Sequence, residues 1–80
     1  MSQARKPTKD EVIQLIAVIT RLPKEKITPQ ANLRADLMMD SLAALDLFVS
    51  IEEQYGLVVK QEEVARLATV GEVLSYFEGL

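Results

Sequence analysis

The sequence predicts an all-α protein, a small four-helix bundle of three main helices and one short helix, with a long loop between helices one and two. Three observations predict this fold. Apolar residues recur at helical spacing in three segments. Two T-x-x-E sequences, at Thr8 and Thr69, match the capping box that starts a helix. The 80-residue chain is 49% hydrophobic, enough for one core, so residues 1–80 are expected to form a single domain with a flexible tail at 1–7.

The first helix is expected to begin after Thr8, which forms the capping box with Glu11. Asp10 and Glu11 lie in the first turn, where the helix dipole favours anions. Pro23 ends the helix, because proline disfavours helical geometry in the residue before it. The apolar face consists of Val12, Leu15, Ile16, Ile19 and Leu22.

Residues 23–40, PKEKITPQANLRADLMMD, form the predicted long loop, with room for one short helical turn. The segment contains two prolines and has no clean period of 2 or 3.6. Loops of this length in a compact domain are usually functional or disordered. The apolar residues Ile27, Leu33 and Leu37 predict that this loop is anchored to the core.

The most apolar helix is predicted from Ser41 to about Tyr55, with Asp40 as its N-cap and Gly56 as its left-handed C-terminal cap. Its apolar arc is wider than one core face requires. The helix is therefore either wedged among other helices or presents apolar surface to a partner.

The rest of the chain predicts a connection and two helices. LVVK, after Gly56, is interpreted as an extended connection that turns apolar side chains inward, since a strand there would have no pairing partner. A short helix is expected from Gln61 to about Leu67. The final helix begins at the second capping box and runs to about Glu78, although Gly71 in its first turn lowers helix propensity.

The composition excludes several classes of function. The chain contains no cysteine and no histidine, which removes disulfides, thiolate metal sites and the commonest general base. A pair of Ser41 with Lys60 or Arg34 has no motif to support it, so intrinsic catalysis is not expected. No metal site is predicted either, because Asp36, Asp40 and Asp46 lack the spacing of a calcium loop.

Charge and hydropathy indicate where the chain acts and with what. Residues 1–30 contain six Lys/Arg against three Asp/Glu, and residues 31–80 contain three against nine. The acidic part suits basic protein partners and excludes nucleic acid, whose phosphates need Lys and Arg. No apolar run approaches the roughly 18 residues of a membrane span, and the basic start has no apolar core behind it, so it is not a signal peptide. A cytoplasmic monomer is expected.

The triplet Asp40-Ser41-Leu42 gains its meaning from its context. On local grounds alone, Asp40 and Ser41 are simply a helix start. Here the triplet ends a long loop, opens an apolar helix and heads an acidic segment. From about Leu33 to Phe77, through DLMMDSL, LDLFVSIEEQYGL and EEVARLATVGEVLSYF, the chain resembles the acyl carrier proteins, the phosphopantetheine-binding carrier protein family.

The resemblance implies a carrier and not an enzyme. The family's D-S-L serine, here Ser41, is esterified with 4′-phosphopantetheine, which a phosphopantetheinyl transferase takes from coenzyme A. The thiol of this arm carries acyl or related intermediates as thioesters. The carrier presents this acyl cargo to acyl-loading and acyl-processing enzymes of fatty-acid, polyketide or another specialised biosynthetic pathway. The start at Met1 and the short tail predict a freestanding carrier rather than a segment of a megasynthase.

The resemblance also implies a partner-binding face and an acyl pocket. The face that meets basic patches on partner enzymes corresponds to Asp36, Asp46, Val49, Glu52 and Glu53. The acyl pocket corresponds to Leu33, Leu45, Phe48, Val59, Val64 and Leu67, residues that also suit an ordinary core. These two interpretations are compatible, because a carrier's pocket is a core that can open.

The sequence departs from the family pattern around Ser41. Carriers of the fatty-acid type usually read L-G-A-D-S-L, whereas Met38 and Met39 replace the small pair here, and two alanines follow Leu42. We expect altered partner choice, with the methionines acting either as a soft contact patch or in loop packing. Lys60 stands where the family has a proline, and nothing in the sequence explains it. The alternative function is a non-modified helical protein-interaction module of the same fold, which the wide apolar arc favours.

Overall fold

The computed structural model describes residues 6–79 of the chain. It contains helix α1 (Lys9–Thr20), a 3-10 turn η1 (Lys24–Lys26), and helices α2 (Ser41–Tyr55), α3 (Gln61–Val64) and α4 (Val70–Glu78). Extended pairing within the described part is limited to one isolated bridge between Asn32 and Thr69. The predicted all-α fold with three main helices and one short helix is confirmed.

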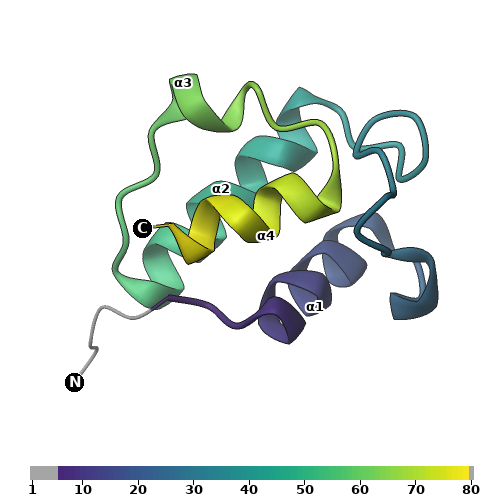
Figure 1. The fold of residues 1–80 in the computed structure, drawn as a ribbon, viewed down its shortest axis with the longest axis horizontal. Coiled ribbons are helices and arrows are strands. Elements are labelled where there is room, and N and C mark those ends of the chain that lie inside the picture. The colour runs from purple at the N-terminus through teal and green to yellow at the C-terminus, as the bar shows by residue number, and fades with distance from the viewer. Residues whose placement is uncertain (1–5, 80) are drawn as a thin grey trace.

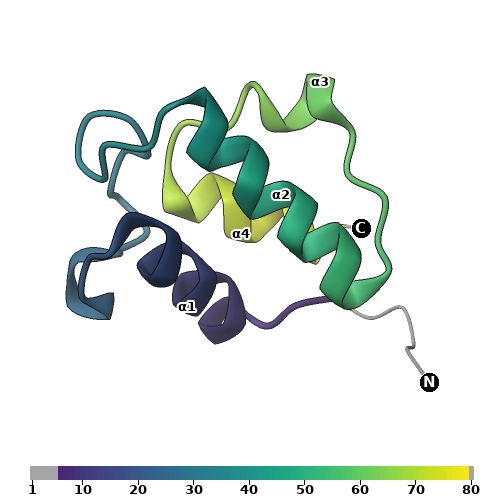
Figure 2. The ribbon, with the colours of Figure 1, turned by 180° about the vertical axis from the view of Figure 1, so that it is seen from behind.

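The three main helices pack around one core, and α3 stands apart from them. Figures 1 and 2, seen from opposite sides, show α4 overlapping α2, with α1 below both. The long loop leads from the end of α1 round to the start of α2, and η1 is the one short helical turn that it contains. Extended connections hold α3 beside α2, on the side away from α1 (Figure 1).

The core draws fully buried side chains from each main helix. Ile16 of α1, Leu47 and Ile51 of α2, and Val73 of α4 each have 0% of their surface exposed. Phe77 of α4 is almost as deeply buried. Its ring centroid lies 6.0 Å from that of Phe48 on α2, so aromatic packing joins the two helices.

Local signals start and stop the main helices as predicted, with one difference. Both capping boxes form, at Thr8 with Glu11 and at Thr69 with Glu72. Gly56 ends α2 in the left-handed conformation. Helix α1, however, ends at Thr20 instead of continuing to Pro23, because Arg21 adopts the left-handed conformation with φ 60°.

Two predictions after α2 need correction. The short helix ends at Val64 and not near Leu67, because the next N–H groups bond to carbonyls three residues back in tight turns, as in Arg66 N to Glu63 O at 3.2 Å. The LVVK connection does not turn all its apolar side chains inward: Val59 is buried but Val58 is 79% exposed, as alternation along an extended chain requires.

The long loop is anchored to the core, as its apolar residues predicted. Ile27, Leu33 and Leu37 are all buried. Leu33 N donates to Ala68 O at 2.8 Å, and Met39 N donates to Leu33 O at 2.8 Å. The loop therefore ties the start of α4 to the start of α2.

The same loop explains the glycine in the first turn of α4. Gly71 N donates to Pro29 O at 2.9 Å. A Cβ at position 71 would lie 3.1 Å from that carbonyl oxygen. Glycine has a low helix propensity, but at position 71 its missing side chain lets the loop backbone approach α4 closely.

Part of the predicted tail, residues 1–5, lies outside the described residues. Pro7 is buried, and Lys6 Nζ donates to the backbone oxygen of Glu78 at 2.7 Å. Lys6 is thereby joined to the end of α4, and neither residue belongs to a free tail.

We predict that Glu72 contributes to the free energy of unfolding at neutral pH and that this contribution is lost in acid. Backbone N–H groups of Ala68 and Thr69 donate to this carboxylate at 2.8 and 3.0 Å and hold the pKa of Glu72 below its usual value of 4.5. A lowered pKa means that ionised Glu72 stabilises the fold above pH 4.5 and that this contribution disappears as the pH falls through the folded-state value. Urea unfolding of the wild type and Glu72→Gln should differ at neutral pH and converge in acid. A difference that does not change with pH would contradict this role.

Candidate functional site

Ser41 is exposed at the first position of α2. Asp40 precedes it as the N-cap, and its carboxylate accepts a hydrogen bond from Ala43 N at 2.8 Å. The carboxylate therefore fixes the helix start while the serine hydroxyl faces outward. Leu42, the third residue of the motif, is 76% exposed.

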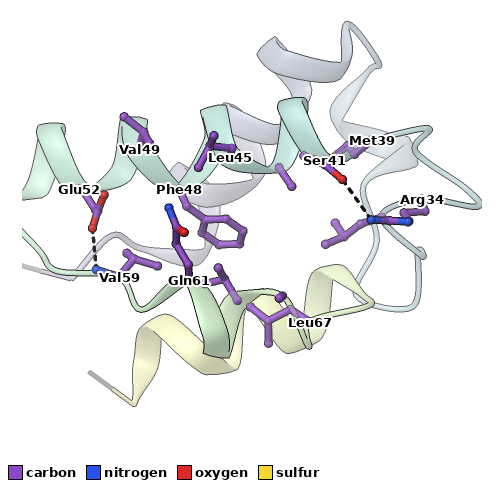
Figure 3. A pocket seen from close by; sticks show the side chains of 14 residues that line it. Arg34, Met39, Ser41, Leu45, Phe48, Val49, Glu52, Val59, Gln61 and Leu67 are labelled. Carbon is purple, nitrogen blue, oxygen red and sulfur yellow. Dashed lines mark hydrogen bonds between the residues drawn. The ribbon is translucent and has the colours of Figure 1, made fainter.

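A cation lies beside the serine. Arg34 Nη2 is 3.4 Å from Ser41 Oγ, and Figure 3 shows the two groups facing each other at one end of a pocket. The long loop positions Arg34, because Arg34 N donates to Asn32 Oδ1 at 3.0 Å.

A pocket of about 370 Å³ begins at this pair and runs along α2. The opposite wall comes from the connection after α2, from α3 and from the turn that follows it (Figure 3). The six residues predicted for an acyl pocket all line it: Leu33, Leu45, Phe48, Val59, Val64 and Leu67. Eight further residues complete the lining: Arg34, Met39, Ser41, Ala44, Val49, Glu52, Gln61 and Ala65.

Side-chain hydrogen bonds fasten the wall at the far end of the pocket. Glu52 Oε2 accepts from Val59 N at 2.8 Å, which ties the connection to α2 (Figure 3). Lys60 N donates to the Tyr76 hydroxyl at 3.2 Å, which ties the same connection to α4. The two hydrogen bonds therefore hold the connection between α2 and α3 to α2 on one side and to α4 on the other.

The carboxylates predicted for the partner face differ in whether they are already hydrogen-bonded within the fold. Asp46 and Glu53 are exposed on α2, and within the described residues their carboxylates have no hydrogen-bond or ionic partner. The Glu52 carboxylate is turned to the connection. Asp36 accepts a hydrogen bond from Asn32 N at 2.7 Å. Val49 is 38% exposed and also lines the pocket.

The two methionines before the motif have different roles. Met39 is 2% exposed and belongs to the core, which is loop packing. Met38 is 81% exposed, and it has φ 59°, in the left-handed region that favours glycine. Only Met38 is therefore available as a contact residue, and its backbone is strained.

Arg34, Glu52 and Gln61 are polar pocket residues whose places the sequence did not predict. Arg34 is seven positions before Ser41 in an irregular loop, and no periodic pattern indicates their contact. Among residues 6–79, no group of three acidic, histidine or cysteine side chains could hold a metal ion. Over the same residues, none of the helices combines the length and hydropathy that crossing a membrane requires.

Comparison with known proteins identifies the family. The family model described as "Phosphopantetheine attachment site" matches residues 10–77. The meromycolate extension acyl carrier protein of Mycobacterium leprae (strain TN) is 34% identical over 77 residues, which cover 91% of this chain and 67% of that protein. The acyl carrier protein of Saccharopolyspora erythraea is 37% identical over 70 residues, which cover 88% and 74% of the two chains.

The fold has a close match among solved structures. The structure of an acyl carrier protein from Enterococcus faecalis superposes with a TM-score of 0.70, at 23% identity, over 91% of this chain and 98% of that chain. Fold and sequence agree that this chain belongs to the acyl carrier protein family, the phosphopantetheine-binding carrier proteins. It is a carrier and not an enzyme, and its cofactor is 4′-phosphopantetheine.

The described residues fit this cofactor. Ser41 provides an exposed hydroxyl, and the Arg34 guanidinium beside it suits a phosphodiester. The first N–H groups of α2 have no partner within the helix, and the positive end of the helix dipole favours an anion there. The pocket opens directly beside the same hydroxyl.

We predict that Asp40→Ala destabilises the protein by about 1 kcal/mol, because α2 loses its N-cap. For a chain of this size the midpoint of thermal unfolding should fall by roughly 4–8 °C. Asp40→Asn should retain most of the stability, because asparagine caps a helix as well as aspartate does. Asp46→Ala, on the exposed middle of α2, is the matched control and should not lower the midpoint, because alanine has the higher helix propensity. An equal loss in Asp40→Asn and Asp40→Ala would show that the charge matters and the cap does not.

Proposed function

We propose that Ser41 is the attachment residue and that this chain carries acyl groups as thioesters on its phosphopantetheine arm. The observation that carries the proposal is the position of Ser41: it is exposed at the start of α2 and opens onto an apolar pocket. The bound cofactor supplies a flexible arm ending in a thiol, which the cysteine-free chain does not itself contain. The chain's own residues hold the arm at its root and shelter what it carries.

The pocket suits an acyl group as cargo. Its volume of about 370 Å³ falls within the range of about 300–1,000 Å³ that is usual for small-molecule sites. Leu45, Phe48 and Val64 form an apolar surface between α2 and α3. Burial of each methylene group would contribute up to about 0.8 kcal/mol.

The partner face proposed here has an apolar stripe beside isolated charges. Leu42, Leu45 and Val49 are exposed by 76%, 44% and 38% and share one side of α2. Asp46 and Glu53 supply the negative charge that would steer basic patches of a phosphopantetheinyl transferase and of acyl-processing enzymes. A cytoplasmic monomer stays a prediction.

The pathway is proposed to be a specialised one. Met38 is exposed directly before the motif, where fatty-acid-type carriers have a small residue, and the strain of its backbone suggests that its side chain is kept for contact. The mycobacterial relative is named for meromycolate extension, which shows that carriers of this similarity can serve specialised acyl chemistry.

We predict a single covalent addition at Ser41. Incubation of the apo protein with coenzyme A and a broad-specificity phosphopantetheinyl transferase should raise the intact mass by one phosphopantetheinyl group. Ser41→Ala should show no addition. Ser50→Ala, on the same helix, is the matched control and should be modified like the wild type.

The same experiment separates the carrier from the interaction module. If the folded wild type stays unmodified while a known carrier is modified in the same tube, Ser41 is only a helix start. The wide apolar arc of α2 would then favour a module that binds partners without a prosthetic group.

We predict that a larger side chain in the pocket reduces the stabilisation that a bound acyl chain gives to the fold. In the wild type, a longer acyl chain on the arm should raise the thermal midpoint until the pocket is full, because each buried methylene adds stability. Ala44→Leu narrows the pocket and should flatten this rise. Ala35→Leu, in an exposed part of the loop outside the pocket, should leave it unchanged. Equal midpoints for all chain lengths in the wild type would show that the cargo stays outside.

We predict selective binding to partner enzymes. In an affinity panel of fatty-acid-synthesis enzymes, the holo protein should bind only some members productively, and Met38→Gly should change the ranking. Tight and productive binding to every member would contradict a specialised pathway.

A further inference from the structure

Arg34 has a positive charge without an acidic partner in the described structure. Ion pairs join Lys9 with Glu78 at 3.8 Å and Lys24 with Asp10 at 3.6 Å, and neither includes Arg34. Its only side-chain hydrogen bond in this part of the chain is the long one, at 3.4 Å, from Nη2 to Ser41 Oγ. A guanidinium has five N–H donors, so a single neutral hydroxyl leaves most of its capacity unused.

The nearby carboxylates are committed to the backbone. Asp36 Oδ2 accepts from Asn32 N at 2.7 Å, and Asp40 Oδ1 accepts from Ala43 N at 2.8 Å. Each of these aspartates holds one end of the loop segment that carries Arg34. Neither aspartate forms an ion pair with Arg34 within residues 6–79, and the guanidinium is directed at the serine.

The backbone on both sides of Arg34 is fixed. Arg34 N and Ala35 N both donate to Asn32 Oδ1, at 3.0 and 2.8 Å. The adjacent Leu33 is buried and is hydrogen-bonded through its N–H to Ala68 O and through its carbonyl to Met39 N. Because the loop cannot shift without breaking these bonds, the Arg34 backbone is fixed and its guanidinium can reach only a limited region beside Ser41.

Arg34 also borders two hollows. Arg34, Met39 and Ser41 line the pocket along α2, and the same three residues line a second hollow together with Met38 and Asp40. A group attached to Ser41 Oγ can thus leave in either direction. A positive charge that lines both hollows influences which of them an anionic arm follows.

We infer that Arg34 is a positioning residue for the prosthetic arm. This inference rests on the proposed attachment at Ser41. The Arg34 guanidinium pairs with the phosphodiester next to Ser41 and holds the root of the arm at the mouth of the pocket. Guanidinium groups match phosphate oxygens in a fork geometry. The pairing limits the directions open to the arm and favours a path along α2.

Arginine side-chain NMR of the apo and holo proteins tests this inference. The Arg34 Nε resonance should shift on phosphopantetheinylation, and its heteronuclear NOE should rise as the side chain stiffens. Arg66, a second arginine in the acidic half and outside both hollows, is the matched control and should not change. The effect should fade in about 1 M salt, where the Debye length is about 3 Å.

Phosphorus relaxation in holo variants gives the second readout. Arg34→Gln should increase the mobility of the phosphodiester and lower the equilibrium constant for its pairing at this position by up to about fivefold, the range expected for an exposed ion pair. Arg34→Lys keeps the charge without the fork and should fall between Arg34→Gln and the wild type. Arg66→Gln removes the same charge at a distance and should match the wild type.

The outcomes separate this inference from the proposed function. If intact mass shows no addition at Ser41, the attachment proposal fails. If Ser41 is modified but Arg34 responds no more than Arg66, and Arg34→Gln leaves phosphorus relaxation unchanged, attachment stands and the positioning role of Arg34 is overturned. A change in modification rate alone, without a change in arm mobility, also overturns it.

Discussion

The short backbone pairing between the long loop and the start of α4 holds the rest of the structure in place. Leu33 N bonds to Ala68 O and Val70 N bonds to Ala31 O, at 2.8 and 3.0 Å. The Leu33 carbonyl then accepts from Met39 N, directly before α2. Because main-chain bonds link three parts of the chain at one point, the beginnings of α2 and α4 are fixed relative to each other. Ordering the loop costs conformational entropy, and these contacts offset part of that cost.

The candidate site depends on this junction at every step. The junction places Asp40 where it caps α2, puts Ser41 outside the core, and presents Arg34 beside the serine hydroxyl. The opposite wall of the pocket is built differently. Helix α3 contains only four residues and has no side-chain cap at its start, and the hydrogen bonds from Val59 and Lys60 fasten the connection before it. A serine placed by the main-chain junction thus faces a wall with few fastenings, and the proposed uptake and release of cargo would use this difference.

The sequence predicted features that local chemistry decides. Capping boxes, the Asp40 N-cap and the Gly56 C-cap each depend on a few neighbouring residues, and all of them form. The six pocket residues came from the family resemblance, and they line one pocket together. Features set by tertiary contacts were missed. The left-handed Arg21 ends α1 early, α3 closes into tight turns, and Glu52 turns from the partner face to Val59 N. The contact of Arg34 with Ser41 depends on the path of an irregular loop, which no periodic pattern encodes.

Native-state hydrogen exchange tests whether the junction of loop, α2 and α4 is part of the rigid framework. The amides of Leu33, Met39 and Val70 donate the hydrogen bonds of this junction. If the account is correct, they should exchange only through global unfolding, with the same free energy of opening as the core amide of Ile51. Opening of these three amides at a much lower free energy, while Ile51 stays protected, would contradict the account. The loop would then be a loose segment, and the placement of Ser41 would have another cause.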